Sequence, residues 1–100
     1  MAVRHAARAR ALEAYDRIIA ADPAAARAWF GRARLLLTVV EDPQRGLADL
    51  RRALEAGFSD TEAAAALVAN ESLLSREEVE KALTERGLLA APTVPAVEGP

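Results

Sequence analysis

Hydrophobic residues recur every three or four positions along most of this chain, which is the spacing of one face of an α-helix. Near the start of the chain, that face carries Leu12, Tyr15, Ile18 and Ile19, and the polar side chains lie mostly opposite. Glu13 stands four residues before Arg17, the favourable order for an ion pair along a helix. The pattern predicts a first helix from about Val3 to Ala20.

Two Asp-Pro pairs, Asp22-Pro23 and Asp42-Pro43, predict where the next two helices begin. Proline disfavours a helical residue before it and suits the first helical position, while aspartate can cap the free N–H groups there. We therefore expect helices over residues 23–39 and 43–56. Because the connection between them is so short, these two helices should pack antiparallel.

Two capping boxes and two glycines delimit the last predicted helices. Ser59–Glu62 and Ser75–Glu78 read S-D-T-E and S-R-E-E, the capping-box pattern, and predict helices over residues 60–69 and 76–86. Gly57 and Gly87 stand where a left-handed residue closes a helix. Residues 89–100 contain three prolines without periodicity and predict a disordered tail.

The composition favours an all-α fold and excludes several kinds of site. Alanine occupies 25 of the 100 positions, whereas β-branched and aromatic residues are scarce. The absence of cysteine excludes disulfides and thiolate sites, and the single His5 excludes a multi-histidine metal cluster. We expect no cofactor and no metal.

Charge is unevenly distributed although the formal net charge is only −2. Residues 1–40 carry an excess of arginine, and residues 41–100 carry an excess of acidic groups. This asymmetry can attract an acidic partner or another copy of the protein head to tail; ordinary solvated helix faces are the alternative. No apolar run has the length of a membrane span, so we expect no membrane partner and a cytoplasmic location.

The spacing along the first two predicted helices resembles the tetratricopeptide repeat (TPR) family. The resemblance is carried by Ala11, Tyr15, Ile18, Pro23 and Trp29, followed by Ala33, Leu36 and the phrase Gly46–Leu54. It is best over residues 8–58. Residues 59–87 keep few of the large anchors of a repeat, so they are interpreted as a degenerate repeat or a cap.

The resemblance implies a single domain over residues 1–88. Its architecture would be antiparallel helical hairpins in a short right-handed superhelix of about five helices. Tyr15, Trp29 and Leu50 would then lie as interior wedges between adjoining helices. The aromatic and alanine stripes would belong to the core and not to a cofactor site.

The resemblance also implies a concave groove lined by the first helix of each repeat. By position, the partner-binding residues would be Arg27, Phe30, Arg34 and Thr38, with Gly31 opening space between them. Arginine forks suit carboxylates, so the expected ligand is a protein or peptide with an acidic segment or a C-terminal carboxylate. The alternative is two solvated arginines beside a half-buried phenylalanine.

Catalysis is not expected, because the two serines near helix starts are explained as caps and no nucleophile stands beside a base. The expected function is a non-catalytic interaction or scaffold module. Two alternatives stay open: a helix–turn–helix-like nucleic-acid module over residues 61–87, whose glutamates make nucleic acid an unfavourable partner, and a purely structural oligomerisation unit. In the repeat pattern the apolar side of the first helix lacks cover, which makes a homodimer a further expectation.

Overall fold

The structure is a computed structural model that describes residues 2–89, and residues 90–100 of the expected disordered tail lie outside the described residues. All regular structure in residues 2–89 is helical, as the composition predicts. The five helices of this part are α1 (Ala2–Ala21), α2 (Ala26–Thr38), α3 (Pro43–Glu55), α4 (Thr61–Ala69) and α5 (Arg76–Glu85).

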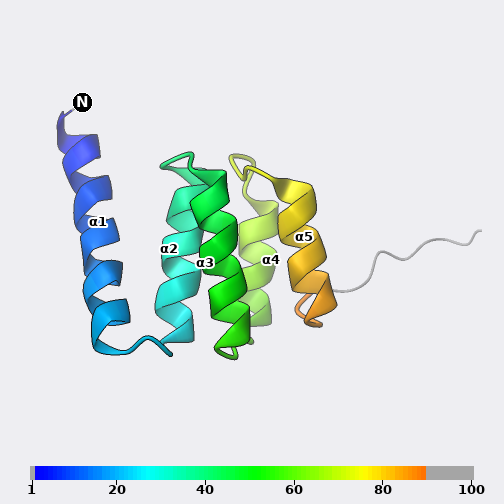
Figure 1. Cartoon of the computed structure of the whole chain (residues 1–100). Helices are drawn as coiled ribbons and strands as arrows, with labels where there is room; N and C mark the ends of the chain where they lie inside the picture. Colours follow the sequence, from blue (N-terminus) through cyan, green and yellow to red (C-terminus); the bar gives the residue numbers. More distant parts are fainter. Residues whose placement is uncertain (1, 90–100) are drawn as a thin grey trace, which may run out of the picture.

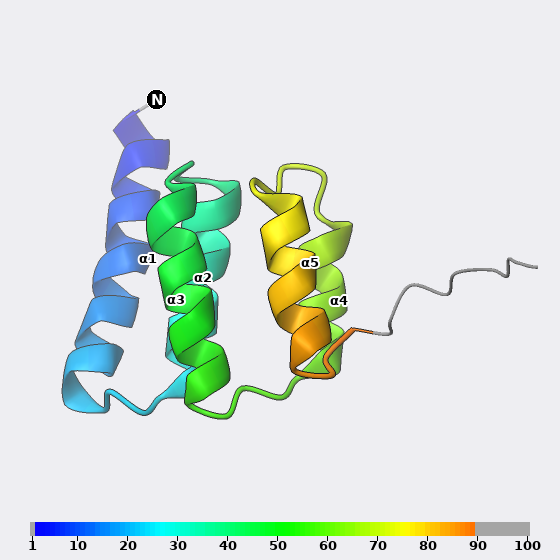
Figure 2. The same ribbon diagram turned by 45° about the vertical axis from the view of Figure 1, so that its right-hand side comes forward.

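The helices form two antiparallel hairpins with α1 at one end (Figure 1). α2 packs closely against α3, and α4 packs against α5. The hairpins meet through α3 and α5, while α1 packs against α2. Figures 1 and 2 both place α1 and α5 toward opposite ends of the row of helices. The antiparallel pairing expected from the short α2–α3 connection is confirmed.

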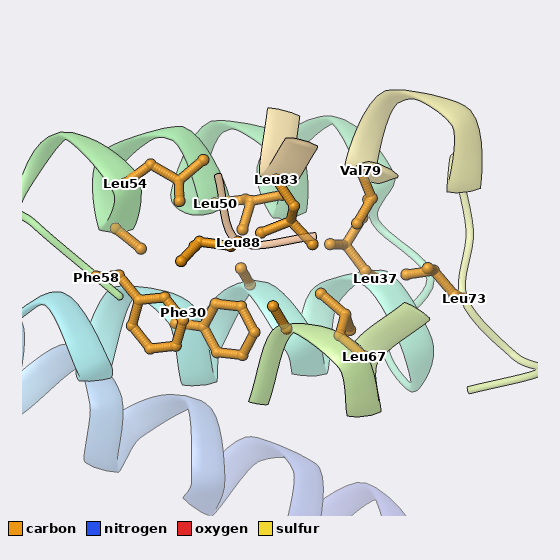
Figure 3. Close-up of a cluster of buried hydrophobic side chains, with 13 residues drawn as sticks. Phe30, Leu37, Leu50, Leu54, Phe58, Leu67, Leu73, Val79, Leu83 and Leu88 are labelled. Carbon is orange, nitrogen blue, oxygen red and sulfur yellow. The ribbon is translucent and has the colours of Figure 1, made fainter. Parts of the chain in front are cut away.

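The core lies between the two hairpins and draws side chains from α2, α3, α4 and α5 (Figure 3). Leu37, Leu50, Leu67, Val79 and Leu83 are almost completely buried there. Leu50 is thus an interior wedge, as predicted. Trp29 is only partly buried and packs at the edge of this core.

Three helix ends follow the sequence signals. The carboxylate of Asp42 accepts a hydrogen bond from the backbone N–H of Arg45 in the first turn of α3. Gly57, at φ 97°, closes α3: its N–H donates to Leu54 O and the next N–H, of Phe58, donates to Ala53 O. This Schellman geometry tucks the Phe58 ring back over the helix it follows. The same geometry occurs at Gly87 after α5.

Three helix starts differ from the prediction. α4 is capped by the carboxylate of Asp60 and not by Ser59, the residue with which the predicted capping box begins. α2 begins at Ala26, not at Pro23, because the Asp22 carboxylate accepts from the N–H of Ala24 and forms a tight turn instead of a cap. Ser75 adopts a left-handed conformation at φ 54° and makes no capping hydrogen bond, so the predicted box before α5 is absent. A left-handed residue does not hold its hydroxyl over the first turn, since capping residues adopt extended geometry.

Candidate functional site

The structure separates the expected site residues into two exposed arginines and two buried side chains. Arg27 and Arg34 are exposed on α2 and lie seven residues apart, which is about two helical turns. Phe30 and Thr38 are only 5% and 8% exposed. The prediction that Phe30 and Thr38 line a partner-binding groove is therefore wrong.

Phe30 belongs to the core because its ring is stacked on that of Phe58. The two ring centroids are 4.1 Å apart and the planes differ by 6°. Figure 3 shows both rings inside the cluster of buried side chains, with Phe58 coming from the segment that closes α3. The sequence does not indicate this contact, because the contact depends on the turn that ends α3. That turn brings Phe58 back across the α2–α3 hairpin to Phe30.

Thr38 uses its hydroxyl within its own helix. The Oγ1 atom donates a hydrogen bond of 2.7 Å to the carbonyl oxygen of Arg34, one turn earlier. This back-bonding satisfies a buried hydroxyl at the last residue of α2. Thr38 is therefore not available to contact a partner, which corrects the expectation.

Gly31 allows α1 to approach α2 and does not open a groove. A Cβ atom at this position would lie 2.5 Å from the ring of Tyr15. Real side chains cannot come that close, so glycine is required wherever this ring is held against the helix. Tyr15 thus wedges between α1 and α2, as expected, and fills the space that Gly31 was predicted to leave open.

An open groove does exist beside Arg27, between the end of α1 and the start of α2. We call it the Arg27 groove, with a volume of about 540 Å³. Its lining residues are Tyr15, Ile18, Ala25, Ala26, Arg27 and Ala28. Ile18 is 47% exposed, which makes it one of the large hydrophobic side chains that reach solvent. The lining is thus apolar apart from the Tyr15 hydroxyl and one guanidinium.

The Arg27 guanidinium is held only loosely and reaches toward the start of α4. Its Nη1 atom lies 3.6 Å from Oδ2 of Asp60, the residue that caps α4, and the arginine side chain is 83% exposed. An ion pair this exposed contributes under about 1 kcal/mol, since water screens both charges. The guanidinium can therefore turn to another carboxylate at little cost.

Arg32 forms a charged cluster that the sequence pattern did not indicate. Its Nε and Nη2 atoms donate to the two carboxylate oxygens of Asp49 at 2.7 and 3.1 Å, and Nη1 donates to Asp16 at 2.6 Å. These bonds join α1, α2 and α3. The hydrogen bonds that Arg32 donates to Asp49 raise the pKa of Arg32, whereas its burial acts in the opposite direction.

Trp29 lies at the outer edge of the same cluster. The guanidinium carbons of Arg32 and Arg52 lie 5.1 and 5.0 Å from the indole centroid, within the range of cation–π attraction. The indole Nε1 donates a 2.7 Å hydrogen bond to the carbonyl oxygen of Pro23. Trp29 therefore anchors the α1–α2 connection, which forms one wall of the Arg27 groove.

Other chemistry is limited within the part of the protein that the structure describes. No group of three or more His, Cys, Asp or Glu side chains in that part is arranged to hold a metal ion. Among the helices described, none combines the length and apolar character that a membrane crossing requires.

Comparison of the sequence and structure with protein-family models, with curated proteins and with solved structures finds no match in any of the three. The resemblance to tetratricopeptide repeats thus stays a prediction from residue spacing.

Proposed function

We propose that this protein is a non-catalytic interaction module of TPR-like architecture that binds an acidic segment of a partner protein. The single observation that carries the proposal is the Arg27 groove, an open apolar hollow lined in part by Arg27, whose guanidinium is only loosely held. Apolar pockets with a few placed polar groups are the usual form of a recognition site. The two antiparallel hairpins support a repeat-like scaffold that presents this groove on rigid helices.

The lining indicates which ligand would fit. An apolar side chain of the ligand would pack on Ile18 and the alanines that line the groove, where burial removes exposed hydrophobic surface from water. An adjacent carboxylate, from Asp, Glu or the carboxyl terminus of a peptide, would pair with Arg27 in the forked geometry that guanidinium groups favour. Arg34, exposed two turns along α2, would attract further negative charge.

Selection from a random peptide library displayed on phage, with the full-length protein as bait, tests this proposal. We expect the selected peptides to contain Leu, Ile or Phe next to Asp, Glu or the carboxyl terminus. Synthetic versions should bind the Arg27→Glu variant about tenfold or more weakly, because the charge pair becomes repulsive. An Ile18→Asp variant should also lose affinity through loss of the apolar contact.

The matched control is Arg45→Glu, which makes the same change in charge at an exposed arginine of α3 outside the groove. Its affinity for the selected peptides should equal that of the wild type. Basic peptides among the selected sequences, or equal losses in Arg27→Glu and Arg45→Glu, would show that recognition does not depend on the Arg27 groove.

A further inference from the structure

The end of the structure opposite α1 has a second open hollow, between α4 and α5. We call it the acidic groove, with a volume of about 540 Å³. Val68 and Leu89 give it apolar lining, and both are only partly buried. Its polar lining is dominated by Glu77, Glu80 and Glu85, against Lys81 alone. The groove therefore offers hydrophobic contact inside a negative rim.

The other basic residue of α5 does not neutralise this rim. The guanidinium of Arg76 donates to the carbonyl oxygens of Val68 and Asn70 at the end of α4. It is thus engaged as a C-terminal cap, where a cation also interacts favourably with the helix dipole. The negative charge of the acidic groove is left for a ligand to complement.

α1 carries exposed positive charge that complements the negative charge of the acidic groove. Arg10 and Arg17 are exposed and stand two turns apart on one side of α1, next to the exposed Ile18. Arg17 lies 4.0 Å from Glu13, but both side chains are mostly exposed, so this pair is weak. This side of α1 has no helix packed against it in the part of the protein that the structure describes.

Distances along the two helices also match. Arg10 and Arg17 are separated by about 10 Å of helix, and Glu77 and Glu85 by about 12 Å, from a rise of about 1.5 Å per residue. One helix lying in the acidic groove could therefore place an arginine near each of these two glutamates. Because α1 and α5 lie toward opposite ends of the row of helices (Figures 1 and 2), the α1 of one molecule cannot reach the acidic groove of that same molecule.

We propose that a second copy of this protein docks its α1, through Arg10 and Arg17, into the acidic groove between α4 and α5. The contact is head to tail, so every assembly, whatever its length, leaves one free basic end and one free acidic end to which further copies can add. Helical units whose end faces are uncovered can add further copies, because each new neighbour buries a face that a single unit exposes. The proposal goes beyond peptide binding, since it uses charged residues outside the Arg27 groove.

The docking should be weak and sensitive to salt. A single helix lying in a shallow groove buries less surface than about 1,200 Å², which is typical of transient contacts. We expect the average mass in sedimentation to rise between about 10 µM and about 500 µM protein without levelling at a dimer. Raising the salt from about 0.05 M to about 0.5 M should abolish most of this rise, because the charges become screened.

Charge reversal at each end tests the proposal. The basic-end variant Arg10→Glu/Arg17→Glu and the acidic-end variant Glu77→Lys/Glu85→Lys should each stay monomeric, because their ends repel. An equimolar mixture of the two should regain the mass increase of the wild type. The control Arg45→Glu, a charge reversal at an exposed arginine of α3 outside both α1 and the acidic groove, should associate as the wild type does. Circular dichroism verifies that every variant is folded.

Three outcomes would overturn the proposal. The first is a wild type that is monomeric at low salt throughout the concentration range. The second is a closed dimer that Glu77→Lys/Glu85→Lys leaves intact, which would indicate pairing of α1 with α1. The third is a mixture that fails to associate although both folded variants are monomeric. Ile18 borders both surfaces and is left unchanged, so loss of peptide binding in Arg27→Glu and loss of assembly here are separate results.

Discussion

Replacing Phe30 by alanine distinguishes a core residue from a groove residue. Phe30 is 5% exposed and its ring lies 4.1 Å from that of Phe58, centroid to centroid. Truncating a buried phenylalanine costs about 3–5 kcal/mol, and the lost aromatic pair lies within that cost. Domains of this size are stable by only about 5–15 kcal/mol, so the variant should lose a large part of its stability.

Urea and thermal unfolding followed by circular dichroism measure this loss directly. The melting temperature should fall by about 12 °C or more, from about 4 °C or more for each kcal/mol in a domain of this length. Arg34→Ala, at an exposed site on the same helix, should change the free energy of unfolding by less than about 0.5 kcal/mol. A Phe30→Ala variant that loses less than about 1 kcal/mol would refute the placement of this ring in the core.

A double-mutant cycle with Phe58→Ala isolates the contact between the two rings. If the rings stack as described, the sum of the two single losses of unfolding free energy should exceed the loss of the double variant by about 1 kcal/mol. Fully additive losses would mean that the two rings contribute to stability independently.

Further predictions concern the charged cluster, a close helix contact and nucleic acid. Asp49→Ala should cost about 2–3 kcal/mol in unfolding free energy because it leaves the part-buried Arg32 guanidinium without its main partner. Asp16→Ala, at an exposed carboxylate, should cost under about 1 kcal/mol. Equal losses in the two variants would contradict the described arrangement of the charged cluster. Gly46→Ala should lower the melting temperature despite the better helix propensity of alanine, since the new Cβ would lie 2.6 Å from Cγ of the buried Leu37; a more stable variant would contradict this packing. Fluorescence anisotropy should detect no salt-dependent binding to duplex DNA, and strong binding at low salt would favour the nucleic-acid alternative.

Local signals were sufficient to predict where most helices begin and end. An aspartate cap before proline at Asp42 and the left-handed glycines Gly57 and Gly87 act through backbone geometry within a few residues, and the structure agrees at each. Ser75 fits the capping pattern equally well but takes a left-handed conformation. The motif alone does not fix the backbone angles of the segment that leads into it.

The candidate site was harder to predict because it depends on contacts between distant residues. Helical spacing correctly placed Arg27 and Arg34 on one exposed side of α2. It could not reveal that Phe58 would cover Phe30, nor that Tyr15 would occupy the space beside Gly31. The Arg32–Asp49 pair spans 17 positions of the sequence and matches no helical period, so periodicity gave no signal for it.

The central claim is that recognition takes place in the Arg27 groove, and NMR titration with one of the peptides selected from the library tests it most directly. We predict that the largest amide shifts will come from Tyr15, Ile18 and residues 25–28, and that the Arg27→Glu variant will show much smaller shifts at the same peptide concentration. Shifts centred on α5, or an unchanged response in Arg27→Glu, would contradict the claim.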